Sequence, residues 1–180
     1  MNTGLIVVDV QPAYDKWCRS IAYQVAKRIN NTRKPTTIVW VGEDFTRDTE
    51  DDVREYLHDA GARPGKLATC AFVEKDYGFF RSWMDMGVAR EDIITVGRAM
   101  LRSSAYGSED LDLTEILGPD CDLDSLTGEP LRRPSFDDRR LREFSTFETC
   151  GGGSDECLAE FELYLEMQDK PFSRLRELVY

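Results

Sequence analysis

The sequence predicts a three-layer α/β/α fold built on a mostly parallel sheet. Short apolar runs rich in β-branched residues recur along the chain, and segments with helical spacing of apolar residues separate them. This alternation is typical of a doubly wound parallel sheet, because each parallel strand needs a long crossover to reach the next. The length of 180 residues suits one core. We therefore expect a single domain over residues 1–180 with Rossmann-type topology.

The first four elements are predicted from local pattern. Residues 4–10 are apolar except for Asp9 and are followed by Gln11-Pro12, which predicts a strand buried on both faces. Residues 17–30 carry apolar groups at helical spacing and predict a helix that stops at an Asn-Asn pair. Residues 36–41 (TTIVWV) predict a second strand. Residues 49–60 predict a helix with Val53, Leu57 and Ala60 on one face.

The remaining elements are predicted in the same way. A third strand is expected at 67–73, an aromatic-rich helix ended by Gly87 at 77–86, and a fourth strand at 93–96. The alternation of strands and helices resumes near the end of the chain. We expect a strand at 144–150, a Gly-Gly-Gly turn, a helix at 155–168 and a strand at 175–179.

Residues 103–142 interrupt this rhythm and are predicted to be an insertion. Residues 103–128 contain acidic side chains and no Lys or Arg, and a group of arginines follows at 132–142. We expect a hairpin around residues 127–129 whose opposed charges pair at the surface. The segment is either a charged surface loop or a lid over the carboxyl edge of the sheet, or a contact with a second subunit.

Composition excludes several classes of protein. A net charge of −11 argues against a nucleic-acid-binding protein, which needs a basic face. No apolar run approaches 18 residues, so no membrane span is expected. The N-terminal run turns acidic too soon for a signal peptide, and the five cysteines are then reduced thiols of a cytoplasmic protein. The expected partner is a small molecule, and a homo-oligomer is left open.

Three residues are expected at the carboxyl ends of predicted strands, where open α/β sheets bind ligands: Asp9, Lys75 and Cys157. Each also has a simpler interpretation, as a turn cap, a solvated lysine and a buried helix cysteine. With Ser154 as N-cap, Cys157 would lie in the first helical turn, where free N–H groups favour a thiolate, although the neighbouring Glu156 opposes it.

Three motifs together resemble the isochorismatase-like cysteine hydrolase superfamily, which includes nicotinamidases and related amidases. An apolar run followed by Asp-x-Gln stands at residues 5–11, a lysine before an aromatic pair stands in residues 72–80, and residues 151–157 (GGGSDEC) resemble the nucleophile loop. The Gly, the hydroxyl residue, the Asp and the Cys of that loop are in register. The resemblance covers residues 4–98 and 144–180 and leaves the insertion outside it.

The resemblance implies a division of chemical roles. Cys157 would attack an amide-like carbon, Asp9 would accept the thiol proton and later activate water, and Lys75 would orient the pair. A cis peptide at Gly152–Gly153 and an oxyanion hole from the amides of Gly153 and Cys157 are also implied. The substrate pocket would include residues that flank these motifs: Gln11, Tyr77, Phe79, Phe80 and Gly152.

The sequence predicts no metal and no cofactor. Nicotinamidases hold a metal through an Asp and two His near strand 2, and the single histidine here is His58. Residues 120–131 resemble a calcium loop but lack its glycine and its final glutamate. We expect a metal-independent cysteine hydrolase acting on a small C–N substrate. The alternative is a catalytically inactive relative that serves as a binding or interaction module.

Overall fold

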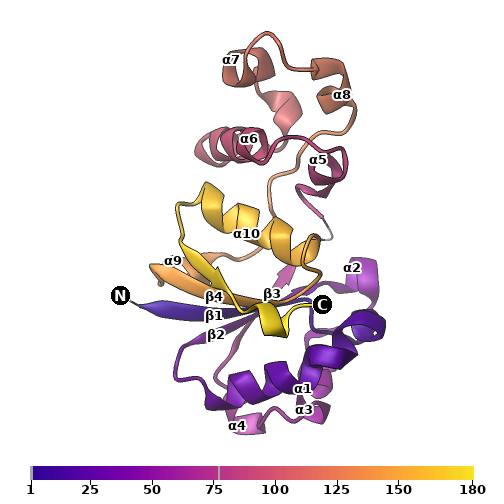
Figure 1. The fold of residues 1–180 in the computed structure, drawn as a ribbon, viewed down its shortest axis with the longest axis vertical. Helices are drawn as coiled ribbons and strands as arrows, with labels where there is room; N and C mark the ends of the chain where they lie inside the picture. The colour runs from indigo at the N-terminus through magenta and orange to yellow at the C-terminus, as the bar shows by residue number, and fades with distance from the viewer. Residues whose placement is uncertain (1, 77) are drawn as a thin grey trace.

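A computed structural model, which describes residues 2–76 and 78–180, confirms the predicted fold class. Its sheet has five parallel strands in the order β3-β2-β1-β4-β5 (Figure 1). The strands are β1 (Thr3–Val8), β2 (Thr36–Val41), β3 (Ala71–Lys75), β4 (Thr146–Gly151) and β5 (Phe172–Arg174). Strand order reverses at β1, which has β2 on one side and β4 on the other. In such sheets a ligand site forms where the order reverses.

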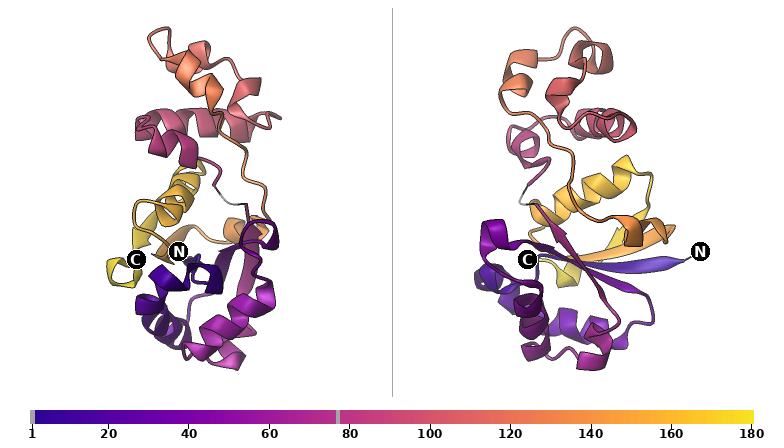
Figure 2. Two further views of the ribbon diagram at one scale, coloured as in Figure 1. Left: turned by 90° about the vertical axis from the view of Figure 1, so that its right-hand side faces the viewer. Right: turned by 180° about the vertical axis from the view of Figure 1, so that it is seen from behind.

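Helices cover both faces of the sheet, giving three layers (Figures 1 and 2). One face carries α1 (Asp15–Asn31), α3 (Glu50–Asp59) and α4 (Pro64–Leu67). The other carries α10 (Cys157–Met167). The strand β1 faces both ways, with Leu5 and Val7 in the first core and Ile6 and Val8 in the second. A strand buried on both faces has the continuous apolar sequence that predicted it.

Helix α10 is buried on almost every side. Eight of its residues are buried, and these include Glu160 and Glu162. Such burial arises because the sheet lies on one side of α10 and α6 (Arg90–Arg102) packs on the other. Gly97 allows this close approach, since a Cβ there would stand 2.3 Å from the Cε of Met167.

The strand predicted at 93–96 was wrong, because these residues belong to α6. The buried positions of α6 are Ile93, Val96, Gly97 and Met100, which have the i, i+3, i+4, i+7 spacing of a helix. The four β-branched residues at 93–96 favour a strand locally, and packing against α10 decides for the helix.

The inserted segment is helical and belongs to a lobe that begins before residue 103. The lobe contains α5 (Arg81–Asp85), α6, α7 (Leu113–Leu117) and α8 (Leu123–Gly128), and it stands beyond α10 in Figures 1 and 2. The hairpin expected at 127–129 was wrong, since α8 occupies most of it. Its capping aspartate, Asp122, accepts a hydrogen bond from the Ser125 amide.

Apolar side chains join this lobe to the core of the domain. Leu113, Leu126 and Leu131 are buried in the same cluster as the outer side of α10. Gly107 forms an antiparallel bridge with Arg132, whose guanidinium pairs with Glu109, so one pair between the two charge blocks forms as expected. The returning chain places Phe136 against Tyr164, with ring centroids 4.9 Å apart, before α9 (Arg139–Arg142).

Smaller differences concern element ends. The predicted strand at 67–73 starts later, after α4, and the helix at 77–86 shortens to α5. The helix at 155–168 begins at Cys157, and the strand at 175–179 is replaced by β5 and the 3-10 turn η3 (Arg176–Leu178). The other short elements are α2 (Glu43–Thr46), η1 (Pro12–Tyr14) and η2 (Ser108–Asp110). Within the described residues no helix is both long and apolar enough to cross a membrane.

The approach of β1 to β4 requires a glycine at the end of β4. Gly151 has φ +76°, and a Cβ there would stand 2.3 Å from the main-chain oxygen of Val8. We expect Gly151→Ala to lower the free energy of unfolding by about 2–4 kcal/mol, from left-handed strain and the clash. The control is Gly128→Ala, where a Cβ meets nothing within 4 Å and the change should stay within about 1 kcal/mol. Urea unfolding of both variants checks this, and equal losses would contradict it.

Candidate active site

The three residues predicted at strand ends come together at the carboxyl edge of the sheet. Asp9 follows β1, Lys75 ends β3, and Cys157 begins α10 after β4. All three line one cavity of about 370 Å³. The cavity therefore lies at the point where strand order reverses.

Asp9 and Lys75 form a buried ion pair. The Nζ of Lys75 lies 3.1 Å from Oδ2 of Asp9, and the two side chains are 2% and 1% exposed. A hydrogen bond between Asp9 and the thiol of Cys157 is among the causes that raise the pKa of that thiol, so the carboxylate lies within reach of the S–H proton.

The main chain of Asp9 is in the left-handed region, with φ +52°. Its amide still continues the sheet pattern by donating to the Val39 oxygen at 2.9 Å. A non-glycine residue in this region is strained, although Asp tolerates it better than most. The kink directly after β1 turns the carboxylate out of the strand direction and into the cavity wall.

Lys75 has a second carboxylate near it. Burial opposes its charge, but the charges of Asp9 and Glu160 outweigh this and raise the pKa of Lys75 above its usual value. Lys75 therefore stays an ammonium group at neutral pH. It is a fixed positive charge that interacts with Asp9, which follows β1, and with Glu160 on α10.

Cys157 is held as a neutral thiol. Its Sγ accepts a hydrogen bond from the Gly153 amide at 3.3 Å. Burial raises the pKa of the thiol to about 12, and the charge of Asp9 adds to this, while Lys75 and the Gly153 amide act against it. Desolvation thus outweighs the effect of the Gly153 amide, which by itself favours the thiolate.

The predicted N-cap was also wrong. The residue before α10 is Glu156, and no side chain caps the helix there. Ser154 lies two residues earlier in the loop, and its amide donates to the Tyr180 oxygen at 2.9 Å. Within the described residues no peptide bond is cis, so the bond expected at Gly152–Gly153 is trans. The Gly153 amide nevertheless points at the sulfur.

Glu160 is a residue that the sequence analysis missed. It is 2% exposed, lines the cavity one helical turn after Cys157, and its Oε1 accepts from the amides of Phe79 at 2.6 Å and Phe80 at 2.5 Å. Burial raises the pKa of Glu160, against the effect of these amides and of Lys75. Cys-x-x-Glu at one-turn spacing was a visible signal, since both side chains then share a helix face.

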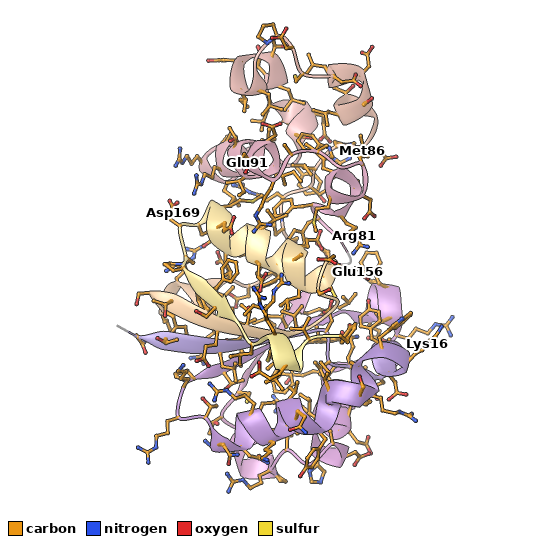
Figure 3. All side chains as sticks on the ribbon, viewed as in Figure 1. Lys16, Arg81, Met86, Glu91, Glu156 and Asp169 are labelled. Atoms are coloured by element: carbon orange, nitrogen blue, oxygen red, sulfur yellow. The ribbon has the colours of Figure 1, made fainter. Side chains whose placement is uncertain are left out.

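Further residues at the cavity were missed because nothing in their local sequence marks them. Arg81 is 3.4 Å from Glu156 and 2.8 Å from Asp85, and Figure 3 shows Arg81 above Glu156 between α5 and α10. Tyr180 also lines the cavity. The wall consists of Asp9, Tyr14, Trp17, Lys75, Gly78, Arg81, Gly153, Ser154, Asp155, Glu156, Cys157, Glu160 and Tyr180.

Most residues expected to form the pocket lie away from its wall. Gln11 is fully buried and turned toward β2. Its side-chain amide donates to the main-chain oxygen of Val41 and to the Asp48 carboxylate, and it accepts from the main-chain amide of Val41. Phe79 and Phe80 pack edge to face in the core and offer only their amides to Glu160. Gly152 adjoins the sulfur of Cys157, and a Cβ added at Gly152 would contact Leu158. Tyr77 lies outside the described residues.

Across residues 2–76 and 78–180, no group of three or more His, Cys, Asp or Glu side chains is arranged to hold a metal ion. His58 lies on α3, and its Nδ1 is 3.1 Å from the Ala62 oxygen.

Comparisons with models of protein families, with curated proteins and with solved structures found no match to this chain.

The buried ion pair gives a prediction about stability. Asp9→Asn or Lys75→Met should each lower the free energy of unfolding by about 3–5 kcal/mol, because each leaves an unpaired buried charge. The double variant should lose at least about 1 kcal/mol less than the sum. The exposed pair Asp137–Arg139 is the control and should show no measurable coupling, since water screens it. Additive losses at Asp9 and Lys75 in urea unfolding would contradict the pairing.

The neutral thiol gives a prediction about pH. With the pKa of Cys157 near 12, its alkylation rate by iodoacetamide should rise about tenfold per pH unit between pH 7 and pH 10. Peptide mapping by mass spectrometry assigns the modified cysteine, with Cys157→Ser as the blank. A rate that levels off near neutral pH would show instead that the sulfur is already ionised.

Proposed function

We propose that this protein is a metal-independent cysteine hydrolase that acts on a small amide-like substrate, with Cys157 as nucleophile. The observation that carries the proposal is the convergence of a thiol, a buried carboxylate and a buried ammonium group in one cavity. A weak nucleophile needs a base and a positive charge within reach, and these three groups supply them.

The proposed first step forms a thioester. Asp9 accepts the S–H proton, the sulfur of Cys157 bonds to the substrate carbonyl carbon, and the C=O electron pair moves to oxygen. The amides of Gly153 and Cys157 are the proposed donors to that oxygen. The carbonyl then re-forms, the C–N bond breaks, and the leaving amine takes the proton from Asp9.

The second step returns the free thiol. Asp9, again a carboxylate, accepts a proton from water as the water oxygen bonds to the thioester carbon. The C–S bond breaks, the acid is released, and the proton returns to the sulfur. Lys75 keeps its own proton throughout and balances the negative charge as it moves between Asp9 and the sulfur.

The size of the cavity supports a small substrate. About 370 Å³ is at the lower end of the range for sites that bind metabolites and drug-sized ligands. The resemblance of residues 5–11, 72–80 and 151–157 to the isochorismatase-like cysteine hydrolases supports the same reaction class.

One observation favours a second function, a binding module without catalysis. The sulfur of Cys157 is protonated and accepts the Gly153 amide that the oxyanion would need. If substrate binding does not displace this contact, the cavity binds a ligand without turnover.

The test is a library of small primary and secondary amides, assayed for released ammonia or amine. The wild-type protein should turn over at least one member, and Cys157→Ser and Asp9→Asn should each lower kcat/KM at least about 10³-fold. Quenched samples should contain an acyl group on Cys157, detected as a mass increase of the peptide that contains it.

The control is Cys121→Ser, which changes a cysteine between α7 and α8 in the helical lobe and should leave kcat/KM unchanged. A protein that binds a library member, shown by a raised unfolding temperature, but neither releases amine nor forms the adduct is a binding module. That outcome would reject the hydrolase.

A further inference from the structure

Tyr180 contacts both loops that carry the reacting groups. Its main-chain amide donates to the main-chain oxygen of Gly152 at 3.2 Å, and its main-chain oxygen accepts from the Ser154 amide at 2.9 Å. Its hydroxyl donates to the main-chain oxygen of Asp9 at 3.3 Å and lies 4.0 Å from the sulfur of Cys157. One residue thus joins the loop after β1 to the loop after β4.

We propose that Tyr180 is a further catalytic residue, whose hydroxyl stabilises the sulfur of Cys157 when it loses its proton. The inference rests on the proposed hydrolase for its consequence in turnover. Its central claim, a hydrogen bond to the ionised sulfur, concerns the thiol alone and is measured without any substrate.

The hydroxyl has one proton and two acceptors in reach. While the sulfur is a neutral thiol, the stronger acceptor is the carbonyl oxygen of Asp9, at the shorter distance. Once Asp9 has accepted the S–H proton, the sulfur is an anion, and hydrogen bonds to charged groups are about twice as strong. Rotation about the C–O bond of Tyr180 then directs its O–H group at the sulfur. The O–H bond itself is not broken at any stage.

The surroundings of Tyr180 favour a donor that keeps its proton. Burial raises the pKa of Tyr180, and the facing groups Cys157 and Asp9, with Cys18 from α1, add to the increase. The charges of Asp9 and Glu160 keep Lys75 in its ammonium form. A neutral hydroxyl adds a donor without adding a charge that would disturb the Asp9–Lys75 pair.

The same hydroxyl supports the strained main chain of Asp9. The left-handed conformation at φ +52° needs contacts that favour it over an extended one. The donor from Tyr180 satisfies the Asp9 oxygen, and the two main-chain hydrogen bonds hold residues 152 and 154 on either side of Gly153. Tyr180 therefore fixes the base and the nucleophile loop relative to each other.

The test variant is Tyr180→Phe, which removes only the hydroxyl and keeps the ring and both main-chain hydrogen bonds. At pH 9 the alkylation rate of Cys157 by iodoacetamide should fall about twofold to fivefold, because the thiolate fraction falls more than the nucleophilicity of the sulfur rises. The matched control is Tyr23→Phe on the exposed side of α1, where the rate should not change.

Turnover gives the second measurement. On any amide that the wild-type protein hydrolyses, Tyr180→Phe should lower kcat at least about tenfold with KM within about twofold, as expected for a donor used only after the sulfur is charged. The unfolding temperature should stay within about 3 °C of the wild type. An unchanged alkylation rate would overturn the inference, whatever the effect on turnover.

The two proposals fail in different ways. If the wild-type protein hydrolyses no amide but Tyr180→Phe still slows alkylation, the hydrolase is rejected and the contact with the sulfur stands. If Tyr180→Phe does not fold, 3-fluorotyrosine at position 180 replaces it. Fluorine makes the hydroxyl a stronger donor, so alkylation should then be faster, and an unchanged or slower rate would overturn the inference.

Discussion

The ion pair between Asp9 and Lys75 is the constraint on which the rest of the site depends. Two charges that are almost completely buried must remain together, since either one alone would be strongly destabilising. Asp9 comes from β1 and Lys75 from β3, so the pair spans β2 and fixes the carboxyl edge of the sheet. Two further features support this pair. The left-handed main chain at Asp9 turns its carboxylate toward the cavity, and the negative charge of Glu160 adds to that of Asp9 in stabilising the Lys75 ammonium group.

Around that pair the protein arranges neutral donors and a protonated thiol. The amides of Phe79 and Phe80 are used by Glu160, and the amide of Gly153 by Cys157. Most polar groups of the site thus already have partners within the protein. A ligand that enters must compete for some of them, above all for Gly153, and the reactivity of the sulfur depends on that exchange.

Much of this could be predicted from the sequence, and the reason is local. The strand ends at Asp9 and Lys75 and the loop before Cys157 have patterns that depend on near neighbours and on the topology of a parallel sheet. What could not be predicted depends on packing between distant segments. The run at 93–96 became helix because α10 lies beside it, and Gln11 turned toward Val41 instead of the cavity. Tyr180 reaches the site from a segment whose own sequence carries no signal for it.

Helix α10 has two duties that limit how this protein could be rebuilt. Its first turn presents the sulfur to the cavity, and its outer side, with Phe161 and Tyr164, is covered by Phe79, Phe136 and the helical lobe. The lobe is therefore not an exchangeable module. A chimera that replaced the chain between α5 and α9 would have to bring its own apolar cover for this helix, or leave two aromatic rings in water directly behind the residues that line the cavity.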